Sequence, residues 1–167
     1  MRVGAQRNEP RDEVSRAEDA LALEHQLCFA LTVAARSVVG AYRPVLEQLG
    51  LTHPQYLAML ALWQRSPRSL KELSRELAHE PATLSVLLNR LQERGLVTRT
   101  RSDGDRRSIL VDLTDEGARM RERAVAIPGI MLERLGLDRA GLEELNSRMR
   151  SLIDAAEQAS HRPAPPI

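Results

Sequence analysis

Two groups of residues in this sequence could do chemistry: a single cysteine and a cluster of arginines. Cys28 is the only cysteine among the 167 residues, so its thiol has no partner for an intrachain disulfide. A thiolate at this position could attack a peroxide oxygen and become a sulfenic acid. The arginines gather in the stretch RTRSDGDRRSILV, residues 99–111, although the formal net charge is only +1. Because local charge density governs binding to nucleic acid, this stretch is a candidate DNA contact.

The arginine cluster lies in a predicted β-hairpin that follows two short predicted helices. The segments LKELSRELAH and PATLSVLLNRLQERG carry leucines at helical spacing, with a turn of three to four residues between them. LVTRT and SILVDL are predicted strands around Asp103-Gly104, a favoured pair of turn residues. Helix-turn-helix proteins place the second helix of such a pair in the major groove of DNA. This order predicts a winged helix-turn-helix in which the hairpin is the wing.

The candidate DNA-binding residues follow from this arrangement. The predicted second helix has small or hydrogen-bonding residues at its outward positions and no acidic residue between positions 81 and 92. Between positions 89 and 107, six arginines stand against three acidic residues, a local net charge of +3. The residues expected to contact bases or phosphates are Pro81, Ala82, Thr83, Ser85, Asn89, Arg90, Arg99, Arg101, Arg106 and Arg107.

The composition favours a mainly helical fold with a small β-hairpin wing. Apolar residues make up 43% of the chain and aromatic residues only 2%, so the core must be built mostly from Leu, Val and Ala. From the N-terminus, the expected parts are a disordered arm (1–17), a helix (18–49), a DNA-binding lobe (50–113), further helices (114–160) and a tail (161–167).

Several helix boundaries can be predicted from single residues. Pro44 is expected to kink or interrupt the first helix, because proline lacks the N–H that a helix interior uses. Thr52, Thr114 and Asp138 are expected to cap the N-termini of the helices that follow them. The helix after Thr114 is expected to kink at residues 128–129, which are Pro-Gly.

Other functional classes lack the residues they need. No run of eighteen apolar residues exists, and the N-terminus lacks the apolar centre of a signal peptide, so a cytoplasmic protein with no membrane partner and a reduced thiol is expected. No phosphate-binding glycine loop or nucleophile–base pair is evident, so neither an enzyme nor a cofactor is expected. Metal ligands at suitable spacing are not found either: the four histidines are His25, His53, His79 and His161.

The stretch GLVTRTRSDGDRRSILVDLTDEG resembles the MarR family of dimeric winged-helix transcriptional regulators, and the resemblance extends over about residues 20 to 160. Asp105-x-Arg107 matches an Asp-x-Arg at the tip of the family's wing, where the two side chains pair and the arginine reaches DNA. Asp105 therefore joins the expected DNA-binding residues. The resemblance implies a homodimer, formed by the first helix and the last two helices, that represses transcription from a pseudo-palindromic operator in double-stranded DNA.

A narrower resemblance concerns the segments EHQLCFAL, AYRPVLEQLGLTHPQYLAML and AVAIPG, which look like the organic-hydroperoxide-responsive branch of the family. Cys28 occupies the position of that branch's reactive cysteine. Of the three tyrosines that surround it in the branch, Tyr42 is present, whereas Thr32 and His53 replace the other two. Thr32 could donate a hydrogen bond to the thiol, and a protonated His53 would favour the thiolate. On a continuous helix Cys28 and Tyr42 are about 21 Å apart, so their contact is expected across the dimer.

The expected function is therefore a DNA-binding regulator, released from its operator when an organic hydroperoxide oxidises Cys28. The alternative within the family is release by a small lipophilic or phenolic ligand, with Cys28 as a packing residue. A thiol peroxidase and an architectural DNA-binding protein without any response also remain open. For the ligand alternative, the resemblance implies a crevice that Phe29, His53, Tyr56 and Trp63 could line, although core packing would equally explain Phe29 and Trp63.

Overall fold

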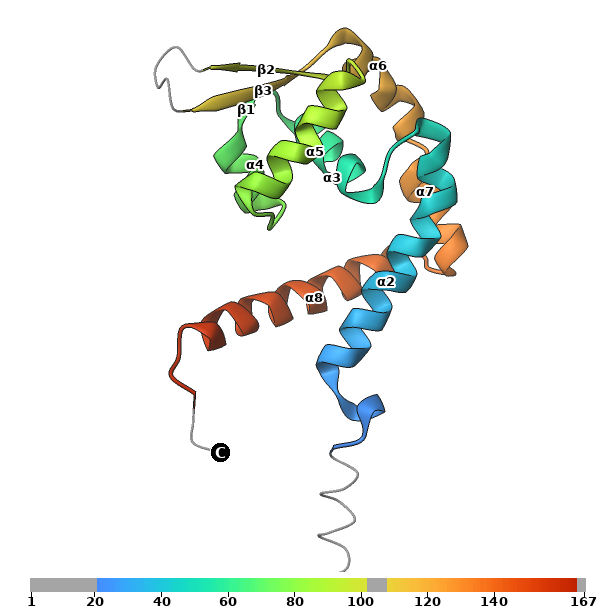
Figure 1. Cartoon of the computed structure of the whole chain (residues 1–167). Coiled ribbons are helices and arrows are strands. Elements are labelled where there is room, and N and C mark those ends of the chain that lie inside the picture. The colour runs from blue at the N-terminus through green and yellow to red at the C-terminus, as the bar shows by residue number, and fades with distance from the viewer. Residues whose placement is uncertain (1–20, 102–107, 165–167) are drawn as a thin grey trace, which may run out of the picture. The chain divides into compact units, whose positions relative to one another are not determined.

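The computed structural model describes residues 21–101 and 108–164, which belong to two units, residues 1–40 and 41–167 (Figure 1). In the first unit, the described residues form a short 3-10 turn, η1 (Leu23–His25), and most of helix α2 (Leu27–Leu46). None of the residues from 21 to 40 is buried. An apolar helix surface exposed in a single chain is typical of an association surface. The large apolar side chains exposed here are Leu21, Leu23, Leu27, Phe29, Val33, Val38 and Val39.

Helix α2 is shorter at its start and more continuous at its end than the sequence predicts. It begins at Leu27, well after the expected position 18, and it continues through Pro44 to Leu46. The predicted interruption at Pro44 is therefore wrong. Only two residues follow Pro44 in the helix, and both, Val45 and Leu46, are buried in the core of the second unit, which holds this last turn in place.

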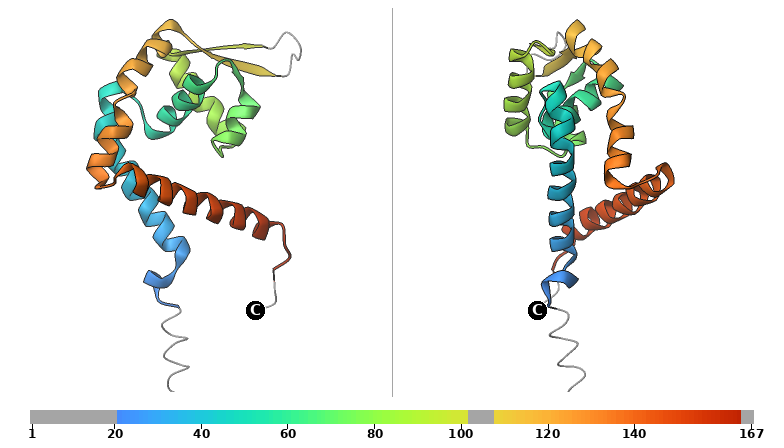
Figure 2. Two further views of the ribbon diagram at one scale, coloured as in Figure 1. Left: turned by 180° about the vertical axis from the view of Figure 1, so that it is seen from behind. Right: turned by 90° about the vertical axis from the view of Figure 1, so that its right-hand side faces the viewer.

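The second unit contains the helix-turn-helix and the hairpin. Its three strands form an antiparallel sheet in the order β1-β3-β2, and Figures 1 and 2 show β2 and β3 running side by side next to α5. The elements in chain order are η2 (Glu47–Leu49), α3 (His53–Gln64), β1 (Arg68–Ser69), α4 (Leu70–Glu76), α5 (Pro81–Glu93), β2 (Val97–Arg101), β3 (Ile109–Leu113), α6 (Asp115–Ala124), α7 (Ile127–Leu135) and α8 (Arg139–Ser160). The prediction of a mainly helical chain with a small winged hairpin is confirmed.

The three predicted N-caps are confirmed by their side-chain hydrogen bonds. Thr52 forms a capping box with Gln55 at the start of α3. The Thr114 hydroxyl accepts from the Gly117 N–H at 3.0 Å, and the Asp138 carboxylate accepts from the Gly141 N–H at 2.7 Å. Each oxygen satisfies a backbone donor that has no partner inside its own helix.

The break between α6 and α7 lies earlier than predicted. The kink was expected at residues 128–129, whereas α6 ends at Ala124 and α7 begins at Ile127. A proline ring clashes with the carbonyl group four residues before it, which for Pro128 is that of Ala124. The helix therefore ends at Ala124, and Pro128 sits in the first turn of α7, where a missing N–H is tolerated.

The two-residue strand β1 is not predicted, because it is too short to show alternation. The sequence indicates only a turn between α3 and α4, yet Arg68 pairs with Val111 and Ser69 pairs with Leu110. The main hairpin has the register Val97 opposite Leu113 and Arg101 opposite Ile109. β1 therefore ties the start of the helix-turn-helix to the hairpin.

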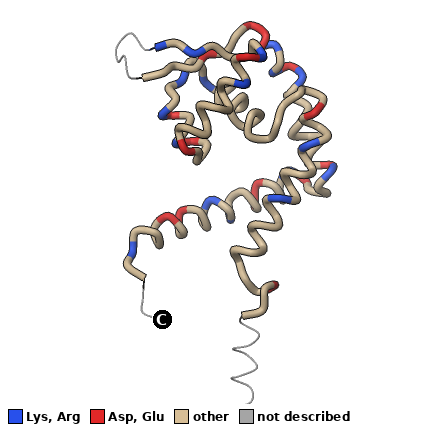
Figure 3. The backbone as a smooth tube through the Cα atoms, in the orientation of Figure 1, with Lys and Arg blue, Asp and Glu red and all other residues tan. Residues whose placement is uncertain are grey.

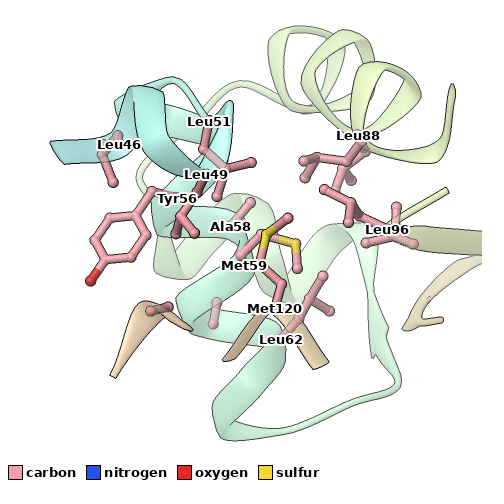
Figure 4. Packing of buried hydrophobic residues seen from close by; sticks show 14 of the residues in the cluster. Leu46, Leu49, Leu51, Tyr56, Ala58, Met59, Leu62, Leu88, Leu96 and Met120 are labelled. Atoms are coloured by element: carbon pink, nitrogen blue, oxygen red, sulfur yellow. The ribbon is translucent and has the colours of Figure 1, made fainter. Parts of the chain in front are cut away.

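The core of the second unit lies among α3, α5, β2 and α6. Figure 4 shows Met59 among side chains of the surrounding elements, with Leu62, Leu88, Leu96 and Met120 around it. Leu62 and Leu88 are at most 1% exposed, and burying a leucine of this kind contributes about 1.5–3 kcal/mol. This packing fixes α5 and the hairpin against each other.

Candidate nucleic-acid interface and thiol site

Helix α5, the candidate recognition helix, begins after a four-residue connection, residues 77–80. Pro81 lies in its first turn, where the absent N–H has no helical partner to lose. The Ser74 hydroxyl donates to the carbonyl oxygen of His79 at 2.6 Å. This bond joins the end of α4 to the connection and so helps to set the angle between the two helices.

One face of α5 is buried and the opposite face is exposed. Leu84, Leu88 and Leu91 are each 0% exposed, so the rotation of the helix about its axis is fixed. The other side of the helix faces outward. The predicted DNA contacts that are exposed are Pro81, Ala82, Thr83, Asn89 and Arg90, and Ser85 is partly exposed.

The two described arginines of the wing, Arg99 and Arg101, have different surroundings. Arg101 is exposed at the end of β2, where Figure 3 marks the Lys and Arg positions in blue. Arg99 is partly buried because its guanidinium points at α5. It donates to the Ser85 hydroxyl at 3.1 Å, to the Ser85 main-chain oxygen at 3.4 Å and to Oδ1 of Asn89. The remaining predicted wing contacts, Asp105, Arg106 and Arg107, lie outside the described residues.

Arg94 contributes to the local positive charge in the sequence but has a structural role. Its guanidinium donates to the carbonyl oxygen of Gly50 and, at 3.1 Å, to that of Leu49. These carbonyls lie at the end of η2, so Arg94 joins the end of α5 to the segment before α3. A count of charges along the sequence does not distinguish such an arginine from one that faces DNA.

Cys28 is exposed and lies at the second residue of α2. The thiol therefore fills no space in the core of this chain. Thr32 follows one helical turn later, and its hydroxyl donates to the main-chain oxygen of Cys28 at 2.8 Å. A hydroxyl has a single proton, so Thr32 in this conformation does not donate to Sγ as the sequence suggested.

Four aromatic rings form a row in the second unit. Tyr42 lies edge-on to His53, with ring centres 5.4 Å apart, and also contacts Tyr56 at 6.2 Å. Tyr56 in turn lies edge-on to Trp63 at 6.4 Å. Burial lowers the pKa of His53, which disfavours the protonated ring. Burial also raises the pKa of Tyr42. It raises the pKa of Tyr56 as well, and the neighbouring Tyr42 adds to that increase.

A cavity of about 450 Å³ opens beside this aromatic row. Of the four residues predicted to line a ligand crevice, Tyr56 and Trp63 do so, whereas His53 packs on Tyr42 and Phe29 is exposed in the first unit. Sequence reasoning missed Arg121 as a lining residue, because only the packing of α6 brings it near α3. The full lining is Tyr56, Leu60, Trp63, Gln64, Arg121, Ala124, Val125 and Pro128.

The part of the chain that the structure describes has neither a cluster of metal ligands nor a helix that could span a membrane. In residues 21–101 and 108–164, no group of three or more His, Cys, Asp and Glu side chains could hold a metal ion. Over the same described residues, every helix is too short or too polar to cross a membrane.

Comparison with known proteins identifies the class of this chain. A family model described as MarR family matches residues 49–108. The organic hydroperoxide resistance transcriptional regulator of Bacillus subtilis (strain 168) is 39% identical over 140 residues, which cover 84% of this chain and 95% of that regulator.

Solved structures agree with this class. A structure of reduced AbfR bound to DNA matches with a TM-score of 0.62 and 31% identity, covering 86% of this chain and 98% of that one; AbfR is from Staphylococcus epidermidis. CouR from Rhodococcus jostii RHA1, bound to p-coumaroyl-CoA, matches with a TM-score of 0.65 and 25% identity, covering 79% and 94%. The Bacillus relative is a transcriptional regulator by name, and the AbfR structure contains DNA. From the family model and the Bacillus regulator together, this chain belongs to the MarR family of DNA-binding transcriptional regulators.

Proposed function

We propose that this chain is a homodimeric repressor that leaves its operator when an organic hydroperoxide oxidises Cys28. One observation carries the proposal: the only cysteine of the sequence is exposed on α2, in a chain 39% identical to a hydroperoxide resistance regulator. The protein works in the cytoplasm, where small thiols keep Cys28 reduced until an oxidant appears.

The chemistry at Cys28 needs only the thiol and the hydroperoxide. The thiolate sulfur attacks the terminal oxygen of ROOH, the O–O bond breaks, and the alkoxide that leaves takes a proton to become the alcohol. Sulfur loses two electrons and becomes a sulfenic acid, while the peroxide is reduced. Because the sequence has no second cysteine, a small thiol then forms a mixed disulfide with Cys28 and releases water.

The second copy completes the surroundings of the thiol. Within this chain the hydroxyl of Thr32 is occupied by a main-chain oxygen, and Tyr42 packs on His53. In the proposed dimer, Tyr42 of the second copy donates to the oxidised or ionised sulfur. Oxidation at this seam then rotates the two DNA-binding lobes relative to each other, which is a known mode of switching in oligomers.

On the DNA side, α5 lies in the major groove and the hairpin lies along the neighbouring backbone. The exposed Thr83 and Arg90 of α5 and Arg101 of β2 supply hydroxyl and guanidinium donors for base edges and phosphates. Two lobes in a dimer bind half-sites about one DNA turn apart, which requires a pseudo-palindromic operator.

The test is a titration of the full-length protein with the DNA upstream of its own gene, followed by fluorescence anisotropy. Cumene hydroperoxide with a small thiol is expected to raise the Kd of the wild type about tenfold or more, in the usual range for coupling between sites. Cys28→Ser is the matched control, because it replaces the thiol with a hydroxyl of similar size that lacks the redox chemistry. Binding that the oxidant leaves unchanged in both proteins would exclude hydroperoxide control.

The cavity beside Trp63 supports a second candidate, release by a small aromatic anion. Tyr56 and Trp63 offer ring faces, and Arg121 is the cation of the lining. A carboxylate on an aromatic ring would pair with the guanidinium while the ring stacks on the aromatic side chains.

This candidate can be tested with 4-hydroxybenzoate as the probe, because Trp63 is the only tryptophan and reports on the cavity. Binding is expected to quench its fluorescence and to release DNA from Cys28→Ser as well as from wild type. Arg121→Gln should abolish both effects. Release that persists in Arg121→Gln, or quenching without release, would rule out the cavity as the control site.

A further inference from the structure

The side chain of Arg99, in the wing, directs all of its described hydrogen bonds to α5. One side of its guanidinium donates to both oxygens of Ser85, and Nη1 also donates to Oδ1 of Asn89. The pairing Arg99–Val111 within the sheet holds the backbone of this residue in the middle of β2. Three of the five N–H donors of this guanidinium are therefore directed at α5.

The contact with Arg99 fixes the orientation of the Asn89 amide. A guanidinium carries only donors, so the amide oxygen, and not the nitrogen, must face it. The NH₂ group of Asn89 is thereby turned away from Arg99. Asn89 is exposed on α5, and no hydrogen bond of its Nδ2 is found among the described residues. The side chain therefore presents two N–H donors outward.

This orientation changes which base Asn89 can recognise. A free asparagine pairs with adenine through both its oxygen and its nitrogen, because adenine offers one donor and one acceptor in the major groove. In Asn89 one lone pair of the oxygen is occupied and the oxygen is turned toward Arg99, so the amide presents mainly its NH₂ group to the groove. Its two donors instead match guanine, which presents two acceptors, N7 and O6.

We propose that Arg99 is a positioning residue, which holds Asn89 as a hydrogen-bond donor and makes guanine the preferred base at one position of each half-site. Through the same contacts Arg99 joins β2 to α5, so the wing and the recognition helix bind DNA as one rigid unit. The proposal rests on α5 lying in the major groove. It assigns Arg99 to specificity, in place of the direct phosphate contact that its charge alone suggests.

The two roles differ in how DNA binding depends on salt and on base sequence. An arginine that neutralises a phosphate contributes about 0.9 to the slope of log K against log salt concentration. An arginine that only positions Asn89 contributes little to this slope but affects the preference at one base pair. Arg99→Met keeps the apolar stem and removes the charge and all donors. Arg101→Met is the matched control, because it makes the same change two residues further along the same strand, at an exposed side chain.

The experiment uses the reduced full-length dimer. A pool of random-sequence duplexes gives the base preferences, and anisotropy at several salt concentrations on the selected duplex gives the slope. For Arg99→Met we expect about tenfold weaker selection of guanine at one position per half-site, with the salt slope unchanged. For Arg101→Met, which removes a proposed phosphate contact, we expect a salt slope lower by about 0.9 with the base preferences of the wild type. A slope that falls by about 1 in Arg99→Met, with base preferences intact, would overturn the proposal.

A second variant tests the donor role without disturbing the contact between wing and helix. Asn89→Asp keeps an oxygen for Arg99 but replaces the two donors with an acceptor. Its preference at the same position is expected to move from guanine to cytosine, whose N4 amino group donates in the major groove. A preference for adenine in the wild type, or an unchanged preference in Asn89→Asp, would contradict the proposal. A wild type that selects no sequence at all would instead overturn the proposed regulatory function, so the two failures are distinguishable.

Discussion

Gly117, at the start of α6, shows how one missing side chain allows the wing to pack on the helices. A Cβ atom built at this position would lie 2.0 Å from the main-chain oxygen of Leu96, just before β2. The carbonyl oxygen of Gly117 also accepts from the indole N–H of Trp63 at 2.8 Å. Three elements therefore meet at a point where only glycine fits.

Gly117→Ala is expected to lower the free energy of unfolding by about 2 kcal/mol or more, because the backbone of α6 must move away from Leu96. Chemical denaturation measures this loss. Gly129→Ala is the control, since a Cβ there meets nothing within 4 Å in α7 and should stabilise the helix by about 0.5–1 kcal/mol. Equal effects of the two substitutions would show that the close approach at Gly117 does not matter.

At this scale, the sequence predicts which side chains of α5 are exposed, because the leucine spacing determines the buried face. It does not predict what an arginine points at. Arg94 and Arg99 add the same charge as Arg101 to the sequence, but the structure directs them to carbonyl oxygens and to α5. The direction of a long side chain depends on neighbours that are distant in the sequence, and charge counts contain no such information.

At the scale of elements, N-caps define where the helices of the DNA-binding lobe begin. The Thr52 hydroxyl accepts from the Gln55 N–H, and the Gln55 side chain accepts from the Thr52 N–H at 2.9 Å. The cap thus holds α3 at the end that carries His53, next to Tyr42.

Thr52→Ala is expected to reduce the free energy of unfolding by about 1 kcal/mol, since the first turn of α3 loses an acceptor for its N–H groups. Thr52→Ser keeps the hydroxyl and should retain most of the stability. Thermal and denaturant unfolding of the two variants would decide the matter. A serine variant as unstable as the alanine variant would mean that the methyl group, and not the cap, is important.

Most elements are predictable because leucine spacing, caps and turn residues are local signals. The elements and boundaries that the sequence does not predict have several causes. β1 is only two residues long and depends on its pairing with β3, and the break before α7 lies four residues before Pro128 because the steric conflict is with an earlier carbonyl group. Pro44 lies in the last helical turn, where burial of the next two residues outweighs the lost hydrogen bond.

At the scale of the whole molecule, α8 leaves apolar side chains exposed. None of its 22 residues is buried, and Leu145 and Ile153 are 45% and 55% exposed. Such an apolar face is expected to be covered by a second copy in the proposed dimer. The resemblance and the sequence pattern predict this association. The surroundings of the proposed control site cannot be predicted from one chain, because in the proposed dimer they include the second copy.

Ile153→Glu is expected to shift the protein from dimer to monomer and to weaken operator binding about a hundredfold, because the two half-sites are no longer bound together. Sedimentation velocity and anisotropy give the two readouts. Ser151→Glu places the same charge on the opposite side of α8 and should leave both unchanged. A dimer that persists in Ile153→Glu with full DNA affinity would exclude α8 from the interface.

In the proposed mechanism, the chemical state of Cys28 sets the occupancy of the operator. The most direct measurement takes both quantities from the same sample: DNA-bound fraction by anisotropy and oxidised fraction by intact mass, at increasing amounts of cumene hydroperoxide. Released DNA is expected to rise in step with protein modified at Cys28, and reduction is expected to restore binding. Complete modification of Cys28 with the DNA still bound, or release while Cys28 remains a thiol, would contradict this mechanism.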